Sequence, residues 1–548
     1  MKMKKRTLVM TGLTLLAVVA LAGCSSKEKA GGTAKETKLP EARFEPDPQT
    51  PSWEKDTEHA AKLKWYVNFD WYAQPGWGVD TVTRKIKEDM NIDVEIVSGN
   101  DEKLNTMMAS GNLPDLVTFD KNLTIAQDAP KFALPLNQLA EKYDPYFLEE
   151  AAKKQTVQWY TKEDGNIYGY PSFSVTQDDY DAGNTVGDQV FIVRKDIYEK
   201  IGKPDMSTPE GFLSALEKAK EATPKADDGS ELIGFASTAI DIANGGDGAM
   251  GGTLQDFLAI PVSKDDAWYD RDADEEYITW LETLRQAYNK ELMSDEQFSD
   301  NDNTMKEKLS QGKYFAYLHS NTKGLNEFMS NNNKRNKDQE YIAIDGPKNS
   351  AGDDSVFTGG TIGGWTNTFI TNQTKEPQKA MELLTYLTSK YGNMVATFGI
   401  EGETYELVDN KAVLSEETEA LRNSDIAKFD KTVGLGSYWF TIDSAYTLSM
   451  GEEPATSIRQ MVRWADDKLA PRFEIEEIDP TPGTSLARNL TTINTDRVQA
   501  IVKYLEATDE KAGKQVWDDF LASRDNNNFE KITKERNDKL ADNVKKLK

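Results

Sequence analysis

Apolar and polar positions alternate from about residue 60 onward in a way that predicts short strands separated by helices. Val82, Ile86 and Met90 recur at helical spacing, so one face of that segment is apolar. The first predicted elements are strands 62–68, 92–97 and 116–119 and helices 80–90 and 103–109. This order of elements predicts an α/β fold with a mostly parallel sheet, in which ligands meet the carboxyl ends of the strands.

A second α/β segment begins with an apolar strand over residues 189–193 and a helix over 194–201. Ser-Thr-Pro-Glu at 207–210 supplies an N-cap and a first-turn proline for the next helix. Helical patterns then dominate, at 274–289, 377–390, 456–469, 495–507 and 509–524. At 548 residues the chain is too long for one core, so two or more domains are expected.

The first 23 residues have the pattern of an export signal. Residues 1–6 read MKMKKR, and residues 7–22 are almost entirely apolar or small. This run is shorter than the roughly 20 residues that a spanning helix needs. It ends in Leu-Ala-Gly-Cys at 21–24, which resembles the lipoprotein box of bacteria. The resemblance implies that Cys24 is acylated and becomes the first residue, whereas an uncleaved anchor or an ordinary secretory signal is the alternative.

Residues 24–60 are predicted to be a flexible tether because residues 25–50 are polar, contain Gly, Pro and Ser, and lack apolar periodicity. Cys24 is the only cysteine, which excludes disulfides, zinc-thiolate sites and a cysteine nucleophile from the folded part. The net charge is −27, and loss of the four cations of the signal makes the mature chain more acidic still. Nucleic acid and an anionic membrane surface are therefore excluded as partners, and only the lipid would hold the chain at a membrane.

Seven short motifs occur in an order that resembles a known family. They are MASGNLPDLV at 108–117, GNIYGYP at 165–171, IVRKD at 192–196, IGKP at 201–204, STPEGF at 207–212, LSQGK at 309–313 and FGIEGETY at 398–405. Together they resemble the type 1 extracellular solute-binding lipoproteins of carbohydrate ABC importers, of the LplA-like and alginate-binding-protein-like kind. The resemblance extends from about residue 62 to the end of the chain.

The resemblance implies a two-lobed periplasmic-binding-protein fold, type II-like and of the large cluster, with an interlobe cleft, hinge crossovers and a helix-rich C-terminal part. We expect residues 61–175 and 340–410 to form the first lobe, and 176–339 and 411–548 the second. Such a protein is a monomer on the extracellular face of the cell membrane. It captures an oligosaccharide and delivers it to the permease subunits of an ABC importer.

Calcium binding is a family feature that we do not expect here. The loop that holds calcium in the family resembles Asp-x-Asp/Asn-Gly-Asn-Gly followed by acidic residues. The corresponding stretch, residues 223–231, reads TPKADDGSE. It is short and lacks the alternating oxygen ligands of a seven-coordinate site. The sequence therefore predicts no cofactor and no metal site.

Aromatic groups beside carboxylates and amides are the chemistry that a sugar needs, because its rings present C–H faces and its rim presents hydroxyls. The densest group is NFDWYAQPGWG at 68–78, directly after the first predicted strand. A glycine-rich run with Trp365 and the segment 436–443 are further groups. The candidate ligand-binding residues are Asn68, Asp70, Trp71, Tyr72, Trp77, Asp120, Phe173, Trp268, Trp365, Tyr438, Trp439 and Asp443. For each aromatic residue, ordinary packing in a core is the alternative.

The sequence contains few of the residues and motifs that enzymes use for catalysis. The chain has two histidines, His59 and His319, which form no metal-binding pair, and it lacks a Gly-x-Ser-x-Gly elbow and a P-loop. Gly246 to Gly251 matches G-x-G-x-x-G, but no strand is predicted before it. We therefore expect a binding protein with no catalytic residue. A lipid-anchored glycoside hydrolase, and a lipoprotein that binds or senses peptides or another small solute, are the competing hypotheses.

Overall fold

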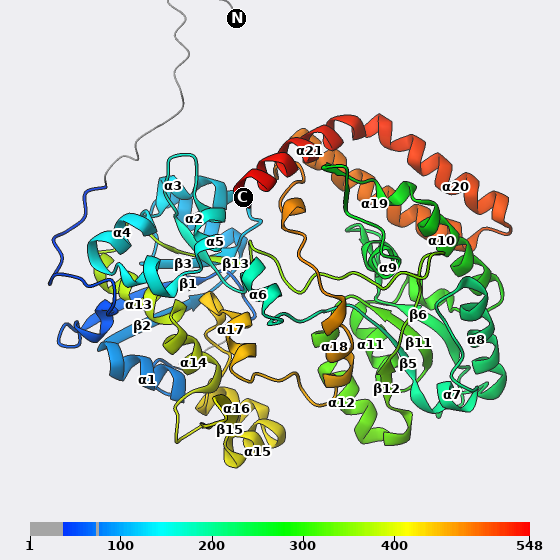
Figure 1. The fold of residues 1–548 in the computed structure, drawn as a ribbon, viewed down its shortest axis with the longest axis horizontal. Helices are drawn as coiled ribbons and strands as arrows, with labels where there is room; N and C mark the ends of the chain where they lie inside the picture. The colour runs from blue at the N-terminus through cyan, green and yellow to red at the C-terminus, as the bar shows by residue number, and fades with distance from the viewer. Residues whose placement is uncertain (1–36, 73–75) are drawn as a thin grey trace, which may run out of the picture.

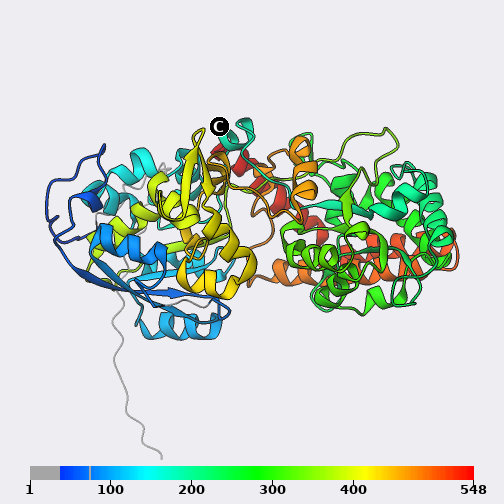
Figure 2. The ribbon, with the colours of Figure 1, turned by 90° about the horizontal axis from the view of Figure 1, so that it is seen from below.

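Two α/β lobes, each with its own sheet, make up the part of the chain that the structure describes (Figure 1). This computed structural model describes residues 37–72 and 76–548, so the predicted signal and Cys24 lie outside the described residues. Figure 2 again separates a blue, cyan and yellow lobe from a green and orange one. The two-lobed α/β class expected from the sequence is confirmed.

The first lobe is built on a five-stranded sheet in the order β2-β1-β3-β13-β4. Its strands are β1 (Ala61–Val67), β2 (Ile92–Ser98), β3 (Leu116–Asp120), β4 (Gly169–Pro171) and β13 (Thr366–Ile370). Strand β1 pairs in parallel with β2 and β3, whereas β13 runs antiparallel to β3 and β4. The three strands predicted at the start of this lobe are confirmed. Strand β13, which lies next to β3, comes from far along the chain.

Helix α1 (Thr81–Met90) shows how the local pattern builds the lobe. Asp80 caps it by accepting a hydrogen bond from the Thr83 amide, and Asn91 ends it in the left-handed region. Its apolar face is buried against the sheet. The other helices of this lobe are α2 (Asp101–Ser110), α3 (Ala129–Phe132), α4 (Leu136–Tyr143), α5 (Lys154–Tyr160), α13 (Pro377–Thr388), α14 (Lys390–Phe398), α15 (Glu416–Ser424), α16 (Ile426–Thr432) and α17 (Ser444–Ser449), with the hairpin of β14 (Tyr405–Val408) and β15 (Lys411–Leu414).

The second lobe has a four-stranded sheet in the order β12-β5-β11-β6. The strands are β5 (Val190–Arg194), β6 (Ile233–Ser237), β11 (Tyr314–His319) and β12 (Tyr341–Ala343). Strand β11 pairs in parallel with β6 and antiparallel with β5. Short hairpins join β7 (Ile240–Asp241) to β8 (Gly246–Asp247) and β9 (Ser263–Lys264) to β10 (Ala267–Trp268).

Helices cover the second lobe and dominate the end of the chain. They are α7 (Lys195–Lys200), α8 (Pro209–Ala222), α9 (Gly252–Phe257), α10 (Glu275–Asn289), α11 (Asp302–Ser310), α12 (Asn326–Arg335), α18 (Arg459–Trp464), α19 (Ser485–Glu506), α20 (Glu510–Ser523) and α21 (Phe529–Lys546). The helix predicted over 456–469 is shorter, and the one predicted over 495–507 starts ten residues earlier because Thr484 caps it. Among the described residues, none of the helices combines the length and the apolar character that crossing a membrane requires.

The C-terminal helix reaches from the second lobe to the first. Its body packs on the second lobe through Ile532 and the ring of Phe529. At its end, the Gln158 side chain donates to the Lys546 carbonyl at 2.6 Å, and the Lys546 ammonium lies over the Trp159 ring. Figure 1 shows this end of α21 beside the cyan helices of the first lobe.

The predicted lobe boundaries need two corrections. Residues 411–449 belong to the first lobe, because Tyr438 and Phe440 are buried in its core and Phe440 lies 4.7 Å from the Trp65 ring. Residues 341–343 belong to the second lobe, because they pair with β5. Chain order alone does not show which of two cores an amphipathic segment will join.

The predicted tether is also too long, since residues 37–60 include a segment packed on the first lobe. The Trp53 ring is buried against Tyr386 and Tyr391, and the Arg43 guanidinium bonds to the Asp56 carboxylate at 2.9 Å. Polar composition suggested a flexible segment, but its few apolar residues and its charges find partners on α13.

Helix α13 is buried at every residue and carries two charges into the lobe. The Lys379 ammonium donates to the carbonyls of Asp56 and Met90 at 2.6 and 2.9 Å. It also lies 3.3 Å from the carboxylates of Asp56 and Glu382. Burial raises the pKa of Glu382, and Lys379 opposes that shift. The ammonium therefore joins the 37–60 segment to the core helix.

Replacing Lys379 with Met should lower the free energy of unfolding of the first lobe by about 3 kcal/mol, because buried carboxylates lose their cation. The measurement is chemical and thermal unfolding followed by circular dichroism. Lys375→Met, at an exposed position of the preceding turn, is the matched control and should leave stability unchanged. Equal stability of both variants would show that the buried ion cluster does not hold this segment.

Candidate functional site

A cleft of about 670 Å³ lies where the two lobes meet. The first lobe contributes Phe173, Trp365 and Ser444 to its lining, and the second contributes residues at the start of β5 and the end of β11. The second-lobe lining residues are Asp188, Gln189, Ser320, Asn321 and Lys323. One cavity thus exposes aromatic rings on one side and hydroxyl, amide and charged groups on the other.

Connecting segments border the cleft. Within the described residues the chain passes between the lobes at 172–189, 344–365 and 450–458. The first two segments contact each other, since the Val175 amide donates to the Thr361 carbonyl at 2.9 Å. The cleft therefore lies directly beside the segments about which the lobes could move.

Five aromatic rings from four distant segments cluster at the first-lobe side of the cleft. Trp365 and Trp439 stack with centroids 4.8 Å apart and planes 14° apart, and Trp71 is nearly parallel to Trp439 at 6.2 Å. Phe69 and Phe173 each lie within 6.3 Å of both Trp365 and Trp439. Trp71 is 60% exposed and Trp365 is 38% exposed, so both offer ring surface to a ligand.

Trp365 is positioned by the glycine-rich run before it. Gly364 has φ of +60°, and a Cβ there would lie 2.1 Å from the Ser172 carbonyl oxygen, so another residue would not fit. The Glu476 carboxylate accepts from the amides of Ile362 and Gly363 at 2.6 and 2.9 Å. Burial raises the pKa of Glu476. This second-lobe carboxylate anchors the turn that presents the Trp365 ring.

Two carboxylates lie near these rings. Asp120, at the end of β3, accepts from the Trp365 indole at 3.2 Å and from the Asn122 amide at 2.8 Å. Asp70 is exposed and stands between Phe69 and Trp71 in the chain. Both positions agree with the expectation that strand ends of the first sheet meet the site.

Other residues predicted for the binding site make contacts that stabilise the fold instead. The Asn68 amide bonds to Asp101, and Trp77 donates to the Ile92 carbonyl. Tyr72 and Tyr438 are buried, with hydroxyls that donate to the Ser437 carbonyl and to Asp80. Trp268 is remote from the rings of the cleft, because it packs against Phe529 and under Arg536 of α21.

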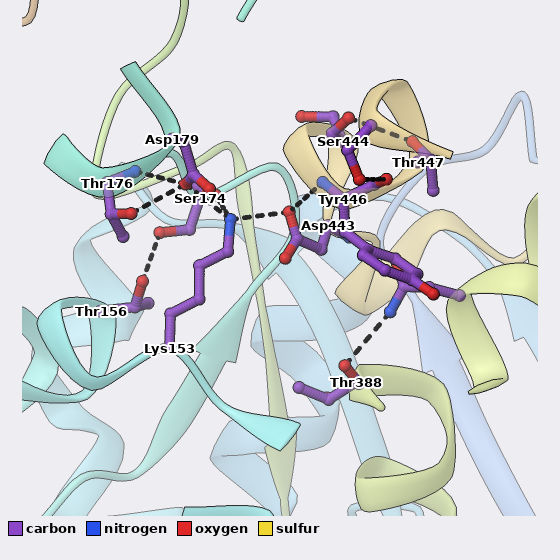
Figure 3. A network of polar contacts seen from close by, with 12 residues as sticks. Lys153, Thr156, Ser174, Thr176, Asp179, Thr388, Asp443, Ser444, Tyr446 and Thr447 are labelled. Carbon is purple, nitrogen blue, oxygen red and sulfur yellow. Dashed lines mark hydrogen bonds and ion pairs between the residues drawn. The ribbon is translucent and has the colours of Figure 1, made fainter. Parts of the chain in front are cut away.

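Asp443 forms part of a charged junction that sequence reasoning missed (Figure 3). The Lys153 ammonium lies 2.6 Å from Asp443, 2.8 Å from Asp179 and 3.1 Å from the Ser174 carbonyl. Asp179 lies on α6 (Gln177–Asp181) of the first connecting segment, and Asp443 caps α17 just before the third. Lys153 therefore ties the first connecting segment, through Asp179, to the first-lobe residue that caps α17, and no local pattern around this lysine indicates that role.

His319 is a buried group beside the second-lobe wall. Its Nδ1 lies 2.8 Å from the Thr238 hydroxyl, and burial lowers its pKa to about 4. Because this imidazole is neutral and only 1% exposed, we interpret His319 as a residue packed in the interior at the end of β11.

The loop 223–231 does not fit a calcium ion. The Asp227 carboxylate accepts from Arg335 and Gln339, and these bonds lower its pKa. Asp228 lies 2.8 Å from the Lys313 ammonium, which lowers the pKa of that carboxyl. The described residues contain no group of three or more acidic or histidine side chains that could hold a metal. Lysine and arginine side chains of the protein are thus already paired with the carboxylates that a metal would need.

Comparison with solved structures finds the same fold in several proteins. An extracellular solute-binding protein from Bifidobacterium longum subsp. infantis has a TM-score of 0.65 at 14% identity, over 88% of this chain and 98% of its own. FusA of S. pneumoniae, an ABC-transporter substrate-binding protein in complex with kestose, has 0.62 at 15%, over 88% and 99%. Alginate-binding protein AlgQ2 has 0.58 at 18%, over 88% and 99%.

At these identities the likeness shows the fold alone. No curated protein matches the sequence. The model of the bacterial extracellular solute-binding proteins matches residues 80–394, which is more than half of the chain. The chain therefore belongs to the family of bacterial extracellular solute-binding proteins.

Proposed function

We propose that this solute-binding protein captures an oligosaccharide in the interlobe cleft and delivers it to the permease of an ABC importer. The observation that carries the proposal is the aromatic cluster of Phe69, Trp71, Phe173, Trp365 and Trp439 beside the cleft. Flat rings match the C–H faces of sugar rings, and the polar wall opposite matches their hydroxyls.

The structural neighbours support the same class of ligand. One of them is an HMO-binding, ABC-transporter-associated solute-binding protein from Bifidobacterium longum infantis, and another, FusA, is in complex with kestose. A peptide would instead need partners for its backbone amides and charged ends, for which the stacked indoles are poorly suited. A binding role also agrees with the neutral, buried His319, which leaves the chain without an exposed histidine beside the cleft.

Trp365→Ala and Trp71→Ala should each weaken glycan binding about tenfold or more, since each removes an exposed ring of the aromatic cluster beside the cleft. The measurement is a thermal-shift screen of the purified chain against an oligosaccharide panel, followed by calorimetric titration. Saturation at 100 times the dissociation constant should add about 2.7 kcal/mol to stability in the wild type.

Trp268→Ala is the matched control, because this ring lies against α21 away from the rings of the cleft. Unchanged affinity in all three variants would show that the aromatic cluster is not the site. The recovered glycan should keep its length, and release of new reducing ends would favour a glycoside hydrolase instead.

We place the protein at the extracellular face of the membrane, held by lipid on Cys24, since the sequence around this residue resembles a lipoprotein box. Cys24→Ala should therefore move the protein from the detergent phase to the aqueous phase in Triton X-114 partitioning of cells that express it. If the variant stays in the detergent phase, the apolar segment 7–22 is itself the anchor.

The loop 223–231 should work without calcium, because Arg335 and Lys313 already neutralise Asp227 and Asp228. Chelation with EDTA should leave the Tm of the purified chain unchanged to within about 1 °C, since only a bound ion stabilises the native state. Added calcium should have equally little effect. A rise of several degrees on adding calcium, reversed by EDTA, would contradict this reading.

A further inference from the structure

We infer that the cleft selects neutral, hydroxyl-rich oligosaccharides and rejects acidic ones such as polyuronates. The inference rests on the proposed function and names the ligand class. It follows from the unpaired acceptors of residues that line the cleft and from how the neighbouring charges are paired.

The second-lobe wall offers hydrogen-bond acceptors that lack donors. Asp188 Oδ1 and Gln189 Oε1 are shielded from solvent and have no hydrogen-bond partner among the described residues. The other end of the Gln189 amide is committed, because it donates to Asp256 at 2.8 Å. Unpaired buried acceptors are costly, so a native structure that keeps them calls for an explanation. A ligand that brings O–H donors would pair them.

Asp188 is held in place by its own backbone. Its carbonyl accepts from the amide and the hydroxyl of Thr322 at 2.8 and 2.9 Å. This contact ties the residue before β5 to the turn after β11, where Ser320 and Asn321 also line the cleft. These bonds fix the backbone that carries the Asp188 side chain at the lining of the cleft.

Two carboxylates of the first lobe add acceptors beside the aromatic cluster. The Asp120 carboxylate is oriented by the Trp365 indole and the Asn122 amide, so it lies at the rim of the stacking surface. Asp70 is exposed in the loop that carries Trp71. A sugar stacked on these rings would direct its hydroxyls toward carboxylates, which accept hydrogen bonds from hydroxyls strongly.

The same carboxylates disfavour an anion. The cations beside the cleft are largely committed to carboxylates of the protein: Lys121 lies 3.3 Å from Glu477, and Lys153 bonds to Asp179 and Asp443. Lys323 is exposed on the second-lobe wall, the same wall that carries Asp188. A uronate stacked on the aromatic cluster would therefore have Asp120 and Asp70 beside it in addition to Asp188, with Lys323 as the one cationic side chain among the described residues that line the cleft.

The test compares matched pairs of ligands by calorimetric titration of the purified chain. Each neutral oligosaccharide that binds is oxidised at its primary alcohols to the uronate form, which keeps linkage and length. Oligogalacturonates and their carboxyl-reduced forms supply a second pair. The acidic member of each pair should bind at least about tenfold more weakly.

Acidic members that bind as tightly as their neutral partners, or more tightly, would overturn the inference while leaving oligosaccharide capture in place. If no member of either class binds across the whole panel, oligosaccharide capture itself fails. The two failures are thus distinct.

Asp188→Ala should weaken the neutral ligand about tenfold or more, because it removes a charged acceptor. Asp178→Ala, at an exposed carboxylate on α6, is the control and should leave affinity unchanged. An unchanged Tm in both variants would show that each is folded. Unchanged affinity in folded Asp188→Ala would remove this residue from the site and overturn its assigned role.

Discussion

The fold of this molecule depends on one constraint: a single chain must complete two separate hydrophobic cores. Strand β13 closes the first sheet although it follows the whole sheet of the second lobe, and the segment with Tyr438 and Phe440 then returns to the first core. The described chain must therefore pass between the lobes at 172–189, 344–365 and 450–458. Residues of the first two connecting segments line the cleft, which therefore lies where the chain crosses between the cores.

Ion pairs and charged hydrogen bonds near these connecting segments hold the segments in defined positions. Lys153 fixes the first connecting segment to the first lobe and bonds to Asp443, the cap of the helix before the third segment, and Glu476 holds the turn that presents Trp365. Both groups are largely removed from solvent, where a charge is tolerated only with good partners. The rings of the cleft are consequently held by rigid neighbours, whereas the polar wall at Asp188 belongs to the other lobe. Movement of one lobe would bring the two kinds of group toward the same ligand.

The local elements could be read from the sequence with good accuracy. The strands β1 to β3 and the apolar face of α1 are set by neighbours within a few residues, and the structure confirms them. Recognition of seven motifs in order also predicted the family and the two-lobed fold. Trp71, Trp365 and Trp439 were chosen from their composition and surroundings, and the structure brings them together.

The tertiary structure decided everything that depends on contacts between distant segments. Trp71 and Trp268 have similar local surroundings, yet the first ring stacks in the exposed aromatic cluster and the second lies under Arg536. Lys153, Asp188 and Gln189 carry no local sign of their roles, because their partners lie in other segments of the chain. The sequence by itself determined the strands, the helices, the family and the absence of thiols. Which core each segment joins, and which polar atoms stay unpaired beside the cleft, follow from packing, because burial and hydrogen bonding depend on proximity in space.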